Sequence, residues 1–293
     1  MPSLQRLFAS GVALGAGGLA YAVAEARSYR VQSHRLPVRA GAPRVTVLHL
    51  SDTHLKERDR MKIRWLRSLP ERLGLVPDLV VATGDLIEDP SGIDPLVDAL
   101  SGLPSRWGKW YVFGSHDYFH STFPGFVKYF TGNRDVVRAK PADTPRLERG
   151  LNDTGWKALT NRSEVLETPG GRIRLTGVDD PYIHREETQH LGRSEGDALA
   201  IGLMHAPEVV SEYALQGYDL VLAGHTHGGQ VRIPFTGAVV TNSTLPCALA
   251  AGPARVGSWW LHVSPGVAQG KFAPIRFNCR PEVTLLTLEP SSP

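Results

Sequence analysis

Five apolar, β-branched runs in this chain end in acidic or histidine residues, and this pattern constrains the fold more than any other feature. The runs are RVTVLHLS (44–51), DLVVAT (78–83), KWYVFG (109–114), ALAIGLM (198–204) and YDLVLAG (218–224). Helical patterns at 61–73 and 93–100 separate the first three runs, and Pro70 is expected to end the former early. Strands that alternate with helices predict an α/β fold, with helices outside a parallel or mixed sheet.

The residues that follow these runs are suited to binding metal. They are Asp52 and His54, Asp85, His116 and Asp117, His205, and finally His225 and His227. Ligands bind beyond the carboxyl ends of strands in open α/β sheets, so we expect these side chains to meet in one crevice. Carboxylates and imidazoles without thiolates suit Mn, Fe or Zn, and suit Ca poorly. The set exceeds one tetrahedral shell, which favours two divalent ions bridged by Asp85 and a phosphoryl displacement between them.

These motifs resemble, in order, the calcineurin-like metallophosphoesterase superfamily. They stand here as Asp52-Thr53-His54, Gly84-Asp85, Gly114-Ser115-His116-Asp117, His205 and Gly224-His225-Thr226-His227. The resemblance covers about 44–289 and implies a four-layer α/β/β/α sandwich of two mixed sheets flanked by helices. GHTHGGQVRIP (224–234) and RFNCRPEVTLLTL (276–288) are similar to the membrane-associated bacterial branch of UDP-2,3-diacylglucosamine pyrophosphohydrolase and related phosphodiesterases.

The resemblance also implies a role for each residue. One metal would be held by Asp52, His54, Asp85 and His227, and the other by Asp85, Ser115, His205 and His225. His116 would lie beside the leaving group as general acid or as a donor to the phosphate, and Asp117 would orient it. The nucleophile would be a metal-bridging hydroxide, with no covalent intermediate. Manganese is the favoured ion.

Ser115 departs from the family pattern, which has Asn at this position. A serine hydroxyl is a poorer ligand than an amide oxygen, and the side chain is shorter by roughly one bond length. We therefore expect weaker binding of the second metal rather than loss of the site, with Ser115 bound directly or through water. His116 remains, and it favours a working enzyme.

The first 30 residues differ from residues 44–289, which we expect to form the catalytic domain. LFASGVALGAGGLAYAVA (7–24) carries no charge and is marginal in length for a membrane span. A membrane anchor is one interpretation. A signal segment is another, because AVA and AEA within 22–26 resemble cleavage sites. A buried helix is the third alternative. The first two predict a membrane-associated or exported protein, with the side of the membrane open.

The predicted function is metal-dependent hydrolysis of a phosphodiester or pyrophosphate bond, with a lipid-linked phosphate as one candidate substrate. A phosphomonoesterase, including a protein phosphatase, is the alternative enzyme. A catalytically silent, metal-scaffolded binding module is the alternative from another class. The formal net charge is only +3 and no long basic run occurs, so we expect no nucleic-acid partner.

Three other groups of residues leave alternatives. His49 lies inside the first run and is predicted to be a core residue. Asp179 and Asp180, in GVDDP, form either a turn or helix cap, or a contact to a metal ligand. Cys247 and Cys279 are either two inert thiols or, outside the cytoplasm, a disulfide pair.

Overall fold

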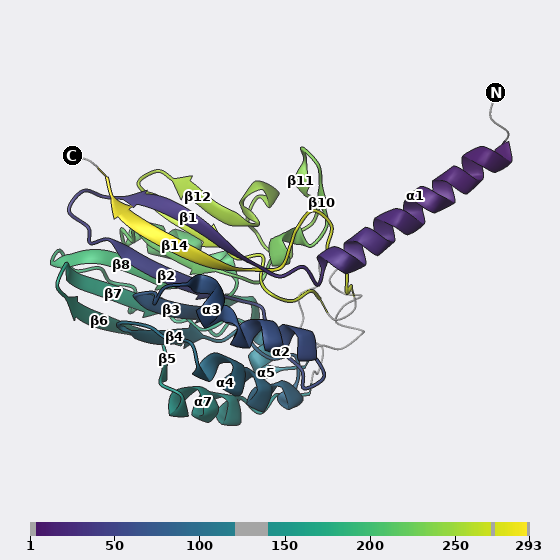
Figure 1. Ribbon diagram of the computed structural model, residues 1–293. Coiled ribbons are helices and arrows are strands. Elements are labelled where there is room, and N and C mark those ends of the chain that lie inside the picture. Colours follow the sequence, from purple (N-terminus) through teal and green to yellow (C-terminus); the bar gives the residue numbers. More distant parts are fainter. Residues whose placement is uncertain (1–3, 121–139, 271–272, 292–293) are drawn as a thin grey trace.

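Two mixed sheets pack face to face in the computed structural model, and helices cover their outer faces (Figure 1). The structure describes residues 4–120, 140–270 and 273–291, with the side chains of residues 4–14 excepted. The arrangement of helices, sheet, sheet and helix confirms the predicted four-layer α/β/β/α sandwich.

The first sheet is built from both ends and the first half of the chain. In spatial order it contains β1 (Arg30–Val38), β14 (Glu282–Pro290), β2 (Val45–Leu50), β3 (Leu79–Thr83), β4 (Gly108–Val112) and β5 (Trp156–Ala158). The strands from β2 to β5 run parallel, whereas β14 runs antiparallel to β2 and parallel to β1. We did not predict β1, so the sheet begins earlier in the chain than the pattern indicated.

The second sheet comes from the other half of the chain. In spatial order it contains β12 (Gly252–Val256), β13 (Trp259–Val263), β9 (Leu220–Ala223), β8 (Asp197–Leu203), β7 (Gly171–Gly177) and β6 (Arg162–Thr168). The strands β7, β8, β9 and β13 are parallel, and an antiparallel partner lies at each edge. A small hairpin, β10 (Arg232–Ile233) and β11 (Gly237–Ala238), lies outside both sheets.

Short helices connect the strands. The α-helices are α1 (Leu4–Glu25), α2 (Arg60–Arg67), α3 (Leu69–Leu73), α4 (Ile93–Ser101), α5 (Ser115–Tyr118), α7 (Thr144–Asp153) and α8 (Val210–Leu215). The 3-10 turns are η1 (Pro90–Gly92), η2 (Pro181–Ile183), η3 (Pro207–Val209), η4 (His227–Gly229) and η5 (Cys247–Leu249). The helix predicted at 61–73 is two helices that meet at Ser68. Pro70 starts the second helix rather than ending the first, because a proline needs no N–H partner in a first turn.

Apolar side chains fill the three spaces between the four layers. Val47, Val81 and Trp110 from the first sheet meet Leu175, Ile201 and Leu222 from the second. Because both faces of the central strands are covered, their sequences are almost continuously apolar. The helices α2, α4 and α7 cover the outer face of the first sheet, and α8 covers part of the second. The central parallel strands therefore point their carboxyl ends at one edge, where the polar residues follow.

The helix α1 extends away from the two sheets, and its last turns are fixed to the chain near residue 277 (Figure 1). The Ala22 carbonyl accepts from the Arg276 amide at 3.0 Å, and the Glu25 carboxylate accepts from the Asn278 amide at 2.6 Å. Within the described residues, no helix has both the length and the apolarity that crossing a bilayer requires. Cys247 and Cys279 are both free thiols, and the latter is buried.

Candidate metal centre

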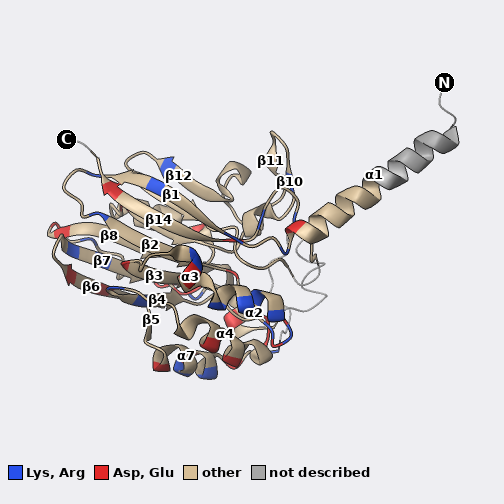
Figure 2. Cartoon of the chain, in the orientation of Figure 1, with Lys and Arg blue, Asp and Glu red and all other residues tan. Residues whose placement is uncertain are grey.

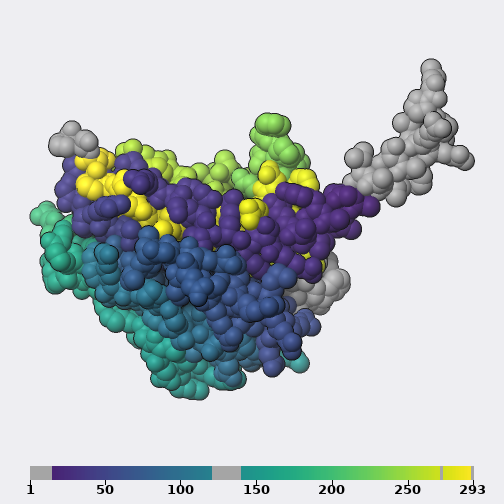
Figure 3. Space-filling model, in the orientation of Figure 1, coloured from purple at the N-terminus to yellow at the C-terminus, as the bar shows by residue number. Residues whose placement is uncertain are grey.

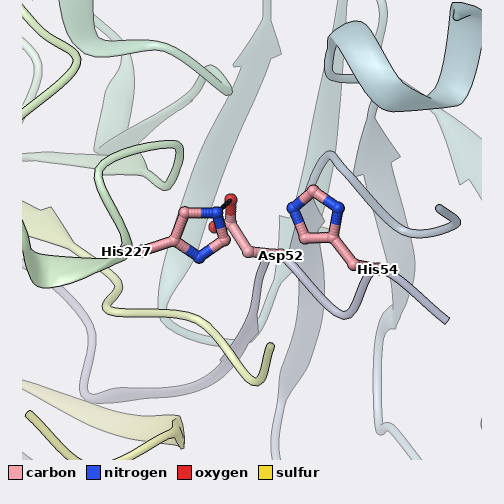
Figure 4. Close-up of side chains that lie close together, drawn as sticks. All are labelled: Asp52, His54 and His227. Carbon is pink, nitrogen blue, oxygen red and sulfur yellow. Dashed lines mark ion pairs between the residues drawn. The ribbon is translucent and has the colours of Figure 1, made fainter. Parts of the chain in front are cut away.

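The predicted ligands come from both sheets and meet at one point. Asp52 and His54 follow β2, Asp85 follows β3, His205 follows β8, and His225 and His227 follow β9. Among the described residues, three groups have ligand atoms that all lie within 4.8 Å of one another: Asp52 with His54 and His227, Asp52 with Asp85 and His205, and His54 with Glu88 and His116. Figure 4 shows the first group, with His227 directed at the Asp52 carboxylate. The convergence predicted from the sequence is thus present in the structure.

Asp85 is the central carboxylate of the cluster. Its Oδ2 atom lies 3.2 Å from Nε2 of His205 and 3.4 Å from Nε2 of His54. Its Oδ1 atom accepts a hydrogen bond of 2.8 Å from the backbone amide of His116. Asp85 therefore faces imidazoles that come from opposite sheets, which is the position that a bridging ligand requires.

The outer nitrogen of each imidazole is fixed by an oxygen of the protein. Nδ1 of His205 lies 2.6 Å from the Thr83 carbonyl, and Nδ1 of His227 lies 3.2 Å from the Ala268 carbonyl. A bond to one ring nitrogen leaves the other as the ligand atom. His225 is turned the other way, since its Nε2 lies 2.8 Å from the Asn242 carbonyl.

The inner nitrogens show that a divalent cation fits this cluster. Nε2 of His54 and Nε2 of His205 are buried, and both face Oδ2 of Asp85 without a well-aligned hydrogen bond among the described residues. A cation bound at this point could take both nitrogens together with the carboxylate as ligands. Carboxylate and imidazole donors are also the set that Mn, Fe and Zn accept. The residues present therefore match the ions that the sequence predicts, without distinguishing among the three.

The backbone at the cluster is strained. Asp52, His54, Asp85, His225 and His227 all have positive φ, between 36° and 69°. Such values are uncommon for residues other than glycine, and they cluster at functional sites. These five candidate ligands lie in one place, which indicates that the fold holds them in unfavourable backbone conformations so that their side chains point into the cluster.

Two glycines allow the segments to approach one another. A Cβ atom at Gly84, where φ is +84°, would lie 2.5 Å from the Gly114 nitrogen and 2.8 Å from Nδ1 of His205. A Cβ atom at Gly224 would lie 2.0 Å from Oγ of Ser51. Side chains at either position would push apart the segments that carry the ligands.

Charges of opposite sign stabilise each other inside the cluster. Burial opposes ionisation of Asp85, but nearby His205 and His116 hold the pKa of this carboxyl well below its usual range. Burial also opposes protonation of His205, but Asp85 raises the pKa of this imidazole well above its usual value. Metal ligands must be deprotonated, so a cation that binds here would displace the proton of His205.

A family model described as calcineurin-like phosphoesterase matches residues 45–229, which include every predicted ligand. This chain belongs to that family. Metallophosphoesterase YkuE of Bacillus subtilis (strain 168), which is uncharacterized, is 26% identical over 293 residues, covering 96% of this chain and 93% of the relative. Phosphodiesterase YaeI of Escherichia coli (strain K12) is 28% identical over 220 residues, covering 72% of this chain and 70% of the relative. Family membership identifies a metal-dependent phosphoester hydrolase.

Among solved structures, the phosphopantetheinyl hydrolase PptH from Mycobacterium tuberculosis matches with a TM-score of 0.41 and 13% identity, covering 79% of this chain and 90% of that chain.

The Asp117 carboxylate binds backbone amides. Its oxygens accept from the backbone amides of Leu86 at 2.8 Å, Ile87 at 3.2 Å and Gly114 at 3.0 Å. These bonds brace the segment after β3 against the start of α5. Asp117 is therefore placed to fix the position of Asp85 through the backbone, and burial raises the pKa of its carboxyl to about 7. Its predicted role in orienting His116 stays a prediction.

The carboxylate beside His116 is that of Glu88, which the sequence analysis missed. Its Oε2 atom lies 3.7 Å from Nδ1 of His116 and 3.0 Å from Nδ1 of His54. The side chain is almost fully buried, and it comes from the same TGDLIED segment as Asp85. Its place directly after the apolar pair Leu86 and Ile87 was the available signal, since acids are rarely buried without a role.

Ser115 is the first residue of α5 and is half-buried at the cluster. A Cβ atom at the preceding Gly114 would lie 2.4 Å from Oδ1 of Asp85 and 2.6 Å from the His205 ring. Position 115 therefore adjoins the pair of residues predicted to hold the second ion. Its role as a ligand stays a prediction.

The segment after β7 forms a wall beside His225. Asp180 caps η2 by accepting from the Tyr182 amide at 3.1 Å, which confirms the cap predicted for GVDDP. The Tyr182 ring lies 4.7 Å from the His225 ring. The other Asp180 oxygen, Oδ2, is buried without a hydrogen-bond partner among the described residues, and burial raises the pKa of this carboxyl to about 7.

Proposed function

We propose that this hydrolase cleaves a phosphodiester or pyrophosphate bond with the help of two divalent ions, of which manganese is favoured. The observation that carries the proposal is the position of Asp85 between imidazoles from both sheets, 3.2 Å and 3.4 Å away. Asp52, His54 and His227 would complete one metal shell, and Ser115, His205 and His225 the other. When bound, the ions would lower the pKa of water and polarise the phosphoryl oxygen.

His116 is the residue that we assign to proton donation. Its side chain is 24% exposed at the edge of the cluster, whereas His54 behind it is only 5% exposed. The two rings lie 4.4 Å apart. A substrate oxygen that faces solvent can therefore reach His116 while the phosphoryl group lies over the ligands. Glu88, on the opposite side of the ring, would hold Nδ1 so that Nε2 donates to the leaving oxygen.

The diester and the lipid-linked substrate are finer parts of the proposal. A relative named as a phosphodiesterase, YaeI, supports the diester over a monoester. The uncharged stretch at residues 7–24 supports membrane association of the catalytic domain, 44–289, through its N-terminal segment. A substrate in the same membrane, such as a lipid-linked pyrophosphate, would fit both features.

Hydrolysis assays on the purified, manganese-loaded protein test the proposal. We expect turnover of bis-p-nitrophenyl phosphate to exceed turnover of p-nitrophenyl phosphate. We also expect His116→Gln to lower diester turnover by about 10²–10⁴-fold while the bound metal is unchanged. His34→Gln, in β1 and outside the cluster, is the matched control.

Three outcomes would oppose parts of the proposal. Preference for the monoester would indicate a phosphomonoesterase. No turnover with Mn, Fe or Zn would indicate a catalytically silent binding module. A normal rate for His116→Gln would remove His116 from the reaction. A parallel screen of lipid pyrophosphates in detergent tests the substrate class separately from the chemistry.

A further inference from the structure

Exposed apolar side chains gather on the β10–β11 hairpin. Among the described residues, five of the large exposed hydrophobic side chains lie within ten positions of the chain: Val231, Ile233, Phe235, Val239 and Val240. Phe235 stands between the two strands of the hairpin and is fully exposed, with a relative accessibility of 109%. The hairpin protrudes from the body in Figure 3, where it forms the green projection above the sheets. An apolar cluster of this kind marks an interaction surface.

The hairpin is continuous with the end of α1. The Arg232 amide donates to the Phe277 carbonyl at 2.9 Å, and the Phe277 ring lies 5.3 Å from the Tyr21 ring on α1. Leu19 and Tyr21 are themselves exposed. We call the combined area the docking surface. Its residues are Leu19, Tyr21, Val231, Ile233, Phe235, Val239 and Val240.

The chain around the hairpin lacks negative charge. No Asp or Glu occurs between Asp219 and Glu282, whereas five basic residues do: Arg232, Arg255, Lys271, Arg276 and Arg280. Of the described ones, Arg232 lies in β10 and Arg280 is exposed next to the end of α1, where its Nε donates to the Ser28 carbonyl. The hairpin shows no acidic residue in Figure 2. The docking surface is therefore apolar, with the exposed Arg280 and the half-buried Arg232 beside it, whereas Arg276 and the Glu25 carboxylate at the end of α1 are buried.

We propose that the docking surface binds the interfacial layer of an anionic lipid bilayer, with Phe235 inserted among the headgroups. Aromatic and aliphatic side chains flanked by arginine are suited to this layer, and each nearby basic residue adds about 1 kcal/mol on an anionic surface. A second copy of the chain is a poorer occupant, because self-association would bring Arg232 and Arg280 of two copies together.

This contact would also orient the catalytic centre. Val231, the first residue of the docking surface beyond α1, follows the candidate ligand His227 by four positions. Binding through the hairpin would therefore hold that side of the cluster close to the headgroups. The proposal extends the membrane association proposed for the N-terminal segment to a second element of the chain, and it does not depend on turnover.

Co-sedimentation of the full chain with vesicles tests the docking surface. The vesicles contain phosphatidylcholine alone or phosphatidylcholine with phosphatidylglycerol. We expect tighter binding to the second kind, and we expect Phe235→Glu to weaken it at least about tenfold. Because α1 is present in both proteins, the difference reports on the hairpin.

Leu215→Glu is the matched control, because Leu215 is 79% exposed at the end of α8. The chain passes from there to the amino end of β9, whereas the cluster follows the carboxyl end of that strand. We expect it to bind vesicles like the unmodified protein. Hydrolysis of a soluble ester by Phe235→Glu, expected to be unchanged, shows that the variant is folded. Equal vesicle binding by Phe235→Glu and the unmodified protein would overturn the proposal. A changed oligomeric state in sedimentation velocity, with vesicle binding unaltered, would assign the surface to a second copy instead.

Discussion

Two groups of buried imidazoles lie near each other in this fold and differ in their partners. His49 in β2 and His262 in β13 meet across the sheets, with their Nδ1 atoms 2.9 Å apart, and Nε2 of His49 lies 2.8 Å from the Thr83 hydroxyl. Burial lowers the pKa of His49 to about 3, so the pair stays neutral. In the metal centre, by contrast, Asp85 raises the pKa of the equally buried His205. Burial alone lowers the pKa of the His49 imidazole, whereas the Asp85 carboxylate outweighs burial at His205 and raises its pKa.

The difference also follows the position along each strand. His49 lies inside β2 and points into the core, as its place in the apolar run predicted, while Asp52 and His54 follow the end of the same strand. Residues that leave a strand can adopt the positive φ values seen at the cluster, whereas residues within the ladder cannot. The strand end is therefore where the fold can aim ligands at a common point.

Removing the Asp85 carboxylate is expected to have the largest effect, because it takes away the charge that distinguishes His205 from His49. We expect Asp85→Asn to lower diester turnover by at least about 10³-fold and to reduce bound metal by about one ion per chain, because both shells lose their shared anion. Elemental analysis and turnover measure this. Asp94→Asn, in an exposed pair with Arg146, is the control. Two retained ions in Asp85→Asn would show that Asp85 does not bridge.

Because His49 and His262 are buried as neutral imidazoles, we predict that the free energy of unfolding falls at acidic pH. The pKa of His49 is about 3 in the folded state, against 6.5 for an ordinary histidine. Between these two pKa values only the unfolded chain binds a proton at His49. The contribution of His49 to the free energy of unfolding is therefore complete above pH 6.5 and is lost as the pH falls towards 3. At pH about 4.5 the loss is about 2.7 kcal/mol, or about 100-fold in the folding equilibrium.

Urea unfolding of the metal-free protein at several pH values measures this loss. We expect His49→Gln to flatten the pH dependence by about one proton. Val47→Ala, a buried change in the same strand, should lower stability equally at every pH. An unchanged slope in His49→Gln would mean that other groups cause the acid sensitivity.

A substitution at Glu88 tests whether a carboxylate that orients an imidazole contributes to the rate of hydrolysis, beyond the effect of burial alone. We expect Glu88→Gln to lower turnover by about 30-fold, because a neutral amide is a weaker acceptor for Nδ1–H of His54 and no longer places a negative charge beside His116. The bound metal should fall far less than in Asp85→Asn. A shift in the pH profile of kcat would accompany the loss. A rate equal to that of the unmodified enzyme would leave Glu88 with a structural role only.

Ser115 offers the smallest and most specific change. We expect Ser115→Asn to tighten the second metal by about tenfold, because an amide oxygen is a better ligand and position 115 adjoins Asp85 and His205. Metal titration by calorimetry measures the two affinities separately. Ser115→Ala, which adds no donor, is the control and should not tighten either. If Asn and Ala behave alike, the residue does not approach the ion.

Local pattern predicted the parts of the fold that are central and apolar. The runs that form β2, β3, β4, β8 and β9 are apolar on both faces, so their burial could be predicted from the sequence of each run alone. The missed strand β1, RVQSHRLPV, is mostly polar, and only Leu36 and Val38 are buried. It is a strand because it pairs along its whole length with β14, some 250 residues away. No local pattern contains that information.

The same distinction holds at the metal centre. The approach of Asp52, His54 and Asp85 to one another could be predicted because a motif places each after a strand, while their role as ligands stays a prediction. The backbone partners of Asp117 could not be predicted, since the loop sets the directions of those amides. Glu88 was missed because its importance lies in being close to His116, which depends on how the segments after β3 and β4 fold against each other.

The place of β14 between β1 and β2 has a consequence for how the protein is made. Those two strands end at Val38 and Leu50, whereas the strand that joins them begins only at Glu282 and is synthesised long after both. Until then β2 lacks a neighbour on that side, with its backbone amides and carbonyls unpaired. The first sheet therefore cannot be completed before residues 282–290 are synthesised, and a nascent chain arrested before residue 282 should remain open to chaperones.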